Sequence, residues 1–289
     1  MIALSKFYGR LGNHLFQYAY VRSAARRLRT QFYCPPWDGD AIFELHEGDE
    51  RALAPAGLTA RFDADPEPGF TPDAMRVGDN TEVSGFFQSE RYYPDKDAVR
   101  RWYSFKEAIA DTVRTRHADL DPGTAVSVSL RIDQDYGGTR EYFPLYPLSY
   151  YEAGLRAVGA VGPVLVFADR PDLAREFFRP LKGHELRFVS GLNGPEQLFA
   201  MSQCRANVIT NSTFAWWGAW LNQRPDRVVV APREWTRPGV GQDVRGILCD
   251  DWVKVRGTIP LWDSLQVWRL RHPMQTWKRV IGRRSQARK

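Results

Sequence analysis

The chain has 289 residues, enough for two ordinary α/β domains with an apolar core in each. Hydrophobic residues make up 43% and charged residues 26%, as is typical of a globular protein. The net charge is +6, but eight of the 40 Lys and Arg residues lie between Val267 and Lys289, where there is no Asp or Glu. The rest of the chain has 32 basic and 34 acidic residues and no nucleic-acid-binding motif, so we expect no nucleic-acid partner.

Neither membrane insertion nor a disulfide framework is predicted. The first residues, MIALSKFYGR, lack the basic start and apolar stretch of a signal peptide, and nowhere is there a run of 18 uncharged apolar residues. A cytoplasmic location is therefore expected. Cys34, Cys204 and Cys249 are far apart and have no metal-site spacing, so we expect reduced packing residues and no structural metal.

The first half begins with a predicted strand, residues 2–7, followed by a loop through Gly9 and Gly12 and then a helix. Apolar residues recur at helical spacing from Leu11 to Leu28, and Arg22, Arg26 and Arg29 are expected to face solvent. Residues 35–80 are rich in Pro, Gly and Asp and show no clear pattern. The turn signal of residues 121–123 favours a domain boundary around residues 111–123.

The second half alternates apolar β-rich runs with amphipathic segments, which predicts a parallel sheet with crossover helices. Strands are expected at residues 125–130, 164–167, 186–189, 207–210 and 228–231. Helices are expected at residues 149–158, 172–178, 195–203 and 214–222. This order indicates a Rossmann-like domain within an α/β fold class.

Two segments lie at predicted strand-to-helix junctions, where free N–H groups favour an anion. The first is GRLGNHLFQYA, residues 9–19, whose glycines allow a ligand to approach the backbone. The second is NSTFAWWG, residues 211–218, in which Ser212 and Thr213 could hold a diphosphate. A helix N-cap followed by two core Trp residues explains the second segment equally well, and the pattern leaves both interpretations open.

Two further polar side chains follow predicted strands, at the edge where open α/β sheets bind ligands. Arg131 could clamp a phosphate, or it could be a surface residue paired with Asp133 or Asp135. Asp169 could accept hydrogen bonds from a guanine edge, or it could cap the helix that begins near Pro171.

Together these segments resemble a known family. The loop of residues 9–19, the segment GFFQSERYY at residues 85–93, Arg131, Asp169 and the run NSTFAWWGAWL at residues 211–221 stand in the order found in bacterial-type α-1,2-fucosyltransferases, glycosyltransferase family 11. Weaker similarity continues through residues 228–235 and 247–253. The resemblance covers about residues 2–256.

The resemblance implies a GT-B-like architecture of two Rossmann-like domains facing a cleft. Residues 1–120 would form an N-terminal acceptor-side α/β domain, residues 121–260 a C-terminal donor-binding domain, and residues 261–289 a basic helix or tail. The implied activity is inverting transfer of fucose from GDP-fucose to the 2-hydroxyl of a galactose-containing glycan, without a metal or other cofactor. The acceptor could be lipid-linked, as in polysaccharide biosynthesis.

Residue roles also follow from the resemblance. Arg131 would contact the β-phosphate and Asp169 the guanine, while Gly12 and Asn13 would close the cleft. The other donor-side residues would be Asn211, Ser212, Thr213 and Phe214, and the acceptor-side residues Gln17, Gln88 and Trp216. Asp133, Asp135 and His14 are candidates for a general base, and the sequence does not choose between them. Ser129 and Ile132 depart from the family pattern, which has His and Arg there.

Two rival functions remain open. Asp133-Gln134-Asp135 could be a DxD site for Mn²⁺ or Mg²⁺, although Asp38-Gly39-Asp40 shows that such triplets also arise elsewhere in the chain. The altered segment around Ser129 is also compatible with a nucleotide-sugar-binding relative that has lost catalysis. In the tail, residues 267–289, Trp and aliphatic residues among the eight cations favour docking on an anionic membrane, as opposed to a solvated tail or a packed last helix.

Overall fold

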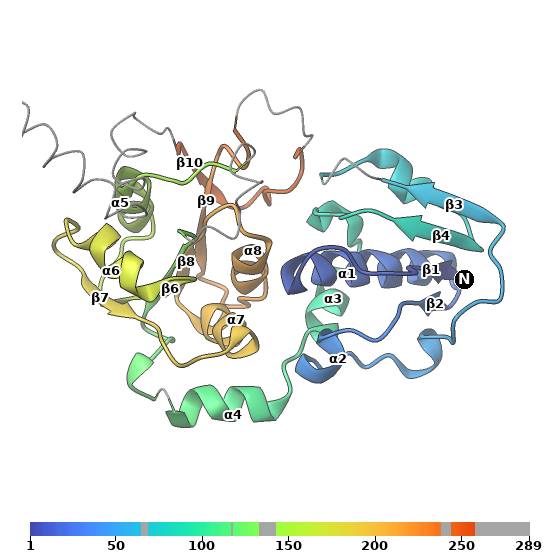
Figure 1. The fold of residues 1–289 in the computed structure, drawn as a ribbon, viewed down its shortest axis with the longest axis horizontal. Helices are drawn as coiled ribbons and strands as arrows, with labels where there is room; N and C mark the ends of the chain where they lie inside the picture. The colour runs from blue at the N-terminus through green and yellow to red at the C-terminus, as the bar shows by residue number, and fades with distance from the viewer. Residues whose placement is uncertain (65–68, 117, 133–142, 238–243, 258–289) are drawn as a thin grey trace, which may run out of the picture.

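The structure is a computed structural model that describes residues 1–64, 69–116, 118–132, 143–237 and 244–257. Figure 1 shows two α/β lobes side by side, with helix α4 running beneath the second lobe. The expected tail, residues 261–289, and the DxD triplet lie outside the described residues. No helix in the described ranges is both long and apolar enough to cross a membrane.

The first lobe is a parallel sheet of four strands in the order β2-β1-β4-β3. These are β1 (Ile2–Ala3), β2 (Phe32–Tyr33), β3 (Ala60–Asp63) and β4 (Thr81–Ser84), and helix α1 (Leu11–Leu28) follows β1. The expected strand at residues 2–7 is therefore much shorter, and residues 4–10 form a loop at the carboxyl edge of the sheet. The short helices of this lobe are α2 (Gly39–Ile42), η1 (Gly48–Glu50), η2 (Pro72–Arg76), η3 (Glu90–Tyr92) and α3 (Lys96–Trp102).

One expectation about α1 is wrong. Arg26 and Arg29 are exposed as predicted, but Arg22 has only 1% of its surface exposed. Its Nε donates to Glu50 at 2.7 Å, and its guanidinium carbon lies 4.2 Å from the centroid of the Trp102 ring. A buried cation is tolerated when it is paired and hydrogen-bonded, and the partners come from residues far along the chain that helical spacing does not reveal.

Helix α4 (Glu107–Arg116) and the turn η4 (Ala118–Leu120) lead from the first lobe to the second. Val113 of α4 and Leu120 are buried in one apolar cluster with Ala200 and Met201 of helix α7 (Gly194–Gln203). The connection thus already packs on the second lobe before the first strand of that lobe begins.

The second lobe is a parallel six-stranded sheet in the order β10-β9-β8-β5-β6-β7. The strands are β5 (Val126–Leu130), β6 (Pro163–Ala168), β7 (Glu185–Phe188), β8 (Ala206–Val208), β9 (Val228–Pro232) and β10 (Val253–Val255). The remaining helices are α5 (Leu148–Ala157), α6 (Pro171–Phe178) and α8 (Thr213–Trp220). The strands and helices predicted for this half are confirmed within two residues at each end, and β10 was not predicted.

The order of the strands creates a switch point between β5 and β8. From β5 the chain adds β6 and then β7 on one side, and it then returns to place β8 on the other side of β5. Loops that leave two neighbouring strands in opposite directions open a crevice at the carboxyl edge of the sheet. The loops after β5 and β8 carry Arg131 and Ser212.

The two lobes share one apolar core. Phe16 of α1 lies with its ring centroid 4.5 Å from Trp216 and 4.9 Å from Trp217 of α8. The helix starts meet even more closely, because a Cβ on Gly12 would lie 2.6 Å from the amide nitrogen of Phe214. The cysteines Cys34, Cys204 and Cys249 are buried and free, as expected.

Candidate active site between the lobes

A cavity of about 440 Å³ lies where the start of α1 meets the carboxyl edge of the second sheet. The first lobe contributes Arg10, Leu11, Gly12 and Asn13. The second lobe contributes Ser129, Leu130, Arg131, Phe167, Ala168, Asp169, Gly194, Gln197, Met201, Ser212, Thr213, Phe214 and Ala215. The cavity is therefore built by both lobes at the switch point.

Three of the described helices begin at this cavity. The lining includes Gly12 in the first turn of α1, Gly194 in the first turn of α7 and Thr213 in the first turn of α8. The first N–H groups of a helix have no acceptor within the helix, and they carry the positive end of its dipole. The arrangement favours an anionic ligand such as a phosphate or diphosphate.

Arg131 and Ser212 meet across the switch point. Nη1 of Arg131 donates to Oγ of Ser212 at 3.3 Å, and the same hydroxyl accepts from the amide of Ala215 at 3.4 Å. Ser212 is thus the N-cap of α8 and a cavity residue at once, while Trp216 and Trp217 are fully buried. The N-cap and the two core Trp residues of this segment are thus confirmed, and diphosphate binding by Ser212 and Thr213 stays a prediction.

Asp169 links the loops that follow β5 and β6. Its Oδ1 accepts from the amide of Ile132 at 2.9 Å, and Asp169 is an exposed residue of the cavity lining. The N-cap of α6 is Arg170, so Asp169 does not cap that helix. A carboxylate has further lone pairs, so Asp169 can still accept hydrogen bonds from a ligand.

The other predicted residues divide into the cavity lining and its support. Gly12, Asn13, Thr213 and Phe214 line the cavity. Gln88 lies behind it, because its buried amide donates from Nε2 to Oδ1 of Asn13 at 2.9 Å.

Three predicted residues are held away from the lining. Gln17 is fully buried, and its amide bonds the backbone N–H and C=O of Tyr8 at 2.9 and 2.8 Å. Trp216 is fully buried and donates from Nε1 to the carbonyl of Ile247 at 2.7 Å. Nδ2 of Asn211 donates to two backbone carbonyls at 3.2 Å. Gln17 and Trp216 therefore support the site from below and do not reach a ligand in this conformation.

The cavity also contains residues that the sequence analysis missed. Arg10 adds a second guanidinium from the first lobe, and Gly194 and Gln197 come from the start of α7. Asn193 and Glu196 form a capping box at this helix start. That box is readable in the sequence, and together with the preceding strand it could have identified a third helix start at the ligand edge.

Comparison with known proteins finds relatives among the glycosyltransferases. Residues 163–256 match glycosyl transferase family 11. Over 124 residues the chain is 31% identical to the O-antigen biosynthesis glycosyltransferase WbnK of Escherichia coli, a match that covers 40% of this chain and 38% of WbnK. Over 171 residues it is 25% identical to an alpha-1,2-colitosyltransferase of Escherichia coli, covering 54% of this chain and 56% of that protein. These matches support the family that the sequence motifs resemble, glycosyl transferase family 11.

The matches span only about half, or less, of the length of these curated relatives. Solved structures confirm the fold. POFUT1 in complex with GDP superposes with a TM-score of 0.51 at 14% identity, over 80% of this chain and 97% of POFUT1. The alpha-1,6-fucosyltransferase NodZ soaked with GDP-fucose gives 0.50 at 14% identity, over 76% and 92%. The chain thus has the GT-B architecture that the resemblance implied.

His14 lies beside the site in an aromatic cluster and not in the cavity lining. Its Nε2 is 3.1 Å from the carbonyl of Gly9, so this nitrogen carries the proton, and its ring lies 5.0 Å from Phe7. Desolvation lowers the pKa of His14, against the opposing effects of the Gly9 carbonyl and the charge of Asp38. Nδ1 is buried and has no hydrogen-bond partner among the described residues, so it is shielded from a substrate in this conformation.

Of the acidic triplets at residues 133–135 and 38–40, the structure describes only the second. Asp133 and Asp135 lie outside the described residues and stay predictions. In the other acidic triplet, Asp40 is paired with Arg51 at 2.7 Å and bonds the amide of Trp37 at 3.0 Å, which gives it a structural role.

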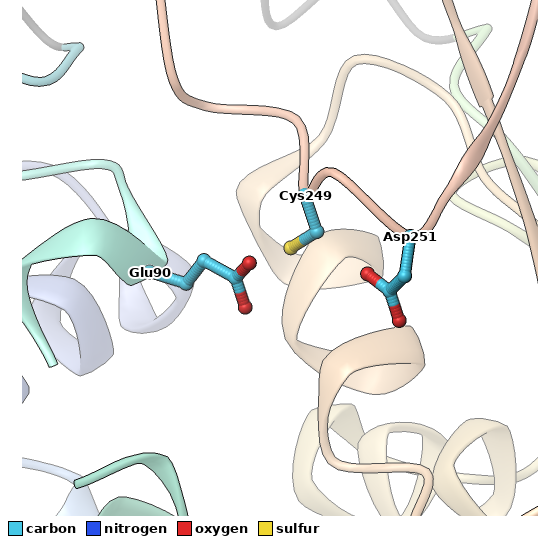
Figure 2. Close-up of side chains that lie close together, drawn as sticks. All are labelled: Glu90, Cys249 and Asp251. Carbon is cyan, nitrogen blue, oxygen red and sulfur yellow. The ribbon is translucent and has the colours of Figure 1, made fainter. Parts of the chain in front are cut away.

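Glu90, Cys249 and Asp251 form a group with metal-ligand atoms within 4.8 Å of one another, and Figure 2 shows their side chains converging from both lobes. Their atoms are already engaged. Glu90 accepts from Trp220 Nε1 at 2.9 Å and pairs with Lys96 at 2.9 Å, and Asp251 pairs with Arg227 at 3.2 Å. Burial and then the charge of Glu90 raise the pKa of Cys249, which keeps its thiol protonated and not the thiolate that a metal needs. The three side chains are therefore better explained as a contact between the two lobes than as a metal site.

Proposed function

We propose that this chain is an inverting glycosyltransferase that transfers fucose from GDP-fucose to the 2-hydroxyl of a galactose-containing glycan. The observation that carries the proposal is the cavity at the switch point, where Arg131 and the starts of three helices surround the space for a diphosphate. The match of residues 163–256 to family 11 and a fold shared with proteins whose structures hold GDP or GDP-fucose support it.

In this proposal the second lobe stabilises the leaving group. The bond between C1 of fucose and the β-phosphate oxygen breaks, and the electron pair leaves with GDP. Arg131 and the amide N–H groups at the start of α8 would meet the charge that develops on the diphosphate, each donor contributing roughly 3 kcal/mol in the transition state. With these donors in place the reaction needs no metal ion. Asp169 would accept hydrogen bonds from the guanine N–H groups.

The acceptor would enter from the first lobe. Inversion requires the 2-hydroxyl of galactose to attack C1 from the face opposite the diphosphate, and the start of α1 supplies the first-lobe part of the cavity lining. The new bond forms between this oxygen and C1, and the hydroxyl proton is released to a base or to water. Asp133 and Asp135 remain candidates for that base because they follow Arg131 closely in the chain.

The proposal is tested first on the donor side. Calorimetric titration with GDP, UDP and CDP should show binding of GDP alone. GDP-fucose together with methyl β-galactoside should then yield GDP and a fucosylated product, with an equal rate in EDTA. Absence of GDP binding contradicts the proposal as a whole, whereas loss of activity in EDTA with GDP binding intact favours the metal-dependent alternative. GDP binding without any turnover favours a non-catalytic relative.

A further inference from the structure

The loop between β1 and α1 continues from the cavity onto the first lobe. Arg10, Leu11, Gly12 and Asn13 line the cavity, and Phe7 and Tyr8 precede them directly in the chain. Because parallel strands end at the same edge of a sheet, this loop and the loop after β4, which carries Phe86, lie at one edge of the first sheet. That edge faces the second lobe, since Gly12 touches α8.

The backbone of this loop is held rigidly from below. Gln17, with no exposed surface, accepts from the Tyr8 amide at 2.9 Å and donates to the Tyr8 carbonyl at 2.8 Å. Nε2 of His14 contacts the carbonyl of Gly9 at 3.1 Å. Both supporting side chains come from α1, so the loop is fixed to the same helix whose start lines the cavity.

The two aromatic side chains of the loop are half-buried, and each contacts other rings. Phe7 stacks on Trp37 with a centroid distance of 5.2 Å and an interplanar angle of 23°. His14 is 5.0 Å from Phe7 and 6.5 Å from Trp37, too close to Trp37 for the two rings to sandwich Phe7 from opposite faces. Tyr8 meets Phe86 edge to face at 6.4 Å. Within the described residues, the ring contacts of Phe7 therefore do not cover it from both faces, and its side chain is only half-buried.

We propose that Phe7 and Tyr8 form the acceptor subsite, in which the apolar face of a neutral hexopyranose lies on the aromatic rings, and that Gln17 is a positioning residue for this loop. The inference rests on the proposed function, because a transferase must hold an acceptor beside its donor cavity. It replaces Gln17 and Trp216 as direct acceptor contacts.

The chemistry of the loop favours a sugar as occupant. Rigid aromatic rings offer a large contact area at low entropy cost, and their apolar faces suit the C–H groups of a pyranose ring. Polar groups that can bond sugar hydroxyls surround the rings: Lys6 lies 4.7 Å from the Tyr8 ring centroid, and the Ser84 hydroxyl bonds that of Tyr8 at 3.4 Å. Phe7 and Tyr8 precede Arg10, which lines the donor cavity, by three and two residues in the chain.

The test uses the full chain with GDP-fucose as donor and methyl β-galactoside as acceptor. We expect Phe7→Ala and Tyr8→Ala to raise the KM for the galactoside by at least about tenfold, with GDP affinity and acceptor-independent hydrolysis of GDP-fucose unchanged. Phe188→Ala is the matched control, because Phe188 is a half-buried aromatic residue on β7 and does not line the cavity. Phe188→Ala should leave the KM for the galactoside and the KM for GDP-fucose unchanged.

Gln17 needs a separate pair of variants because it is buried. Gln17→Met fills a similar volume without hydrogen bonds, and Gln17→Ala removes both the volume and the bonds. Positioning predicts that both variants raise the acceptor KM while GDP affinity stays the same. If Gln17→Met has the wild-type acceptor KM and only Gln17→Ala raises it, the role of Gln17 is packing alone and the positioning role is refuted.

Saturation-transfer NMR, with GDP present, gives a readout that does not need turnover. Transfer from aromatic protons to methyl β-galactoside or methyl β-glucoside should be seen with the wild type and weakened in Phe7→Ala. If neither glycoside shows transfer, or if both loop variants keep the wild-type KM for the galactoside, the acceptor subsite is refuted. Intact GDP binding would still leave the proposed function standing. Failure of GDP to bind the wild type would instead remove the proposed function itself.

Discussion

Arg131 and Ser212 occupy corresponding places after two adjacent strands, and the bond between them fixes the guanidinium at the start of α8. The guanidinium of Arg131 therefore lines the cavity and is held by two segments, the one that follows β5 and the one that follows β8. A charge held in place before the reaction costs little reorganisation in the transition state.

We therefore predict that Arg131→Ala lowers kcat with GDP-fucose by about 10²-fold to 10³-fold, since one preorganised donor to the leaving group is lost. Arg131→Lys should recover only part of this loss, because an ammonium cannot reproduce the planar, bidentate guanidinium. Steady-state kinetics would measure both effects. Arg179→Ala, which alters an exposed arginine paired with Glu176, is the control and should be neutral. An Arg131→Ala variant with wild-type kcat would refute the role.

His14 allows a prediction about pH. Burial places the pKa of His14 in the folded chain below the ordinary value of 6.5. Below pH 6.5 the unfolded chain then binds more protons than the folded chain, so this residue's contribution to stability is full above that pH and is lost as the pH falls towards the folded pKa. The free energy of unfolding in urea should drop more between pH 7.5 and pH 5.5 for the wild type than for His14→Gln. An equal drop in both proteins would show that burial of His14 does not contribute to the pH dependence of stability.

At the scale of elements, the contact between the starts of α1 and α8 forms one wall of the cavity. A side chain on Gly12 would meet Thr213 and Phe214, with its Cβ 2.6 Å from the Phe214 amide nitrogen. Backbone atoms at the start of a helix cannot move aside without displacing the helix. The small residue at position 12 is therefore a condition for the two helix starts to face one ligand.

Gly12→Ala should lower the free energy of unfolding by about 1–3 kcal/mol through overpacking, although helix propensity alone would favour Ala by about 1 kcal/mol. The same change should weaken GDP binding, because the two helix starts move apart. Gly78→Ala is a suitable control, since a Cβ at Gly78 has open space around it. Denaturant unfolding and calorimetry would test both effects, and a stabilised Gly12→Ala variant with normal GDP affinity would disprove the close contact.

At the scale of the whole molecule, the two lobes are also in contact away from the cavity. The indole of Trp220 donates to Glu90 at 2.9 Å, and the hydroxyl of Ser89 donates to the carbonyl of Gly246 at 2.6 Å. The apolar cluster around Trp216 includes residues of both lobes. Lobes that share a core in this way are expected to unfold together.

We predict a single calorimetric transition whose van't Hoff and calorimetric enthalpies agree. Trp216→Phe should lower the midpoint without splitting the transition, at a cost of about 2–3 kcal/mol from lost volume and the lost indole hydrogen bond. Hydrogen exchange should then accelerate in α1 and α8 alike. Two separate transitions in the wild type would show that the lobes are independent.

The sequence by itself determined the second lobe, because its signals are local. Buried strands of five or six residues, helix caps such as Asn193 and Ser212, and polar residues at strand ends can be recognised within a short window. From these the α/β fold and the places of Arg131, Asp169 and Ser212 at the ligand edge could be predicted.

Only the tertiary structure decided the first lobe and the support of the site. Strands of two residues, such as β1 and β2, leave no periodic pattern. The burial of Arg22, Gln17 and Trp216 depends on partners distant in the chain, Glu50 and Ile247 among them. Spacing along a helix shows which residues share a face, but not whether that face meets solvent, a ligand or the other lobe, because that depends on contacts between segments far apart in the sequence.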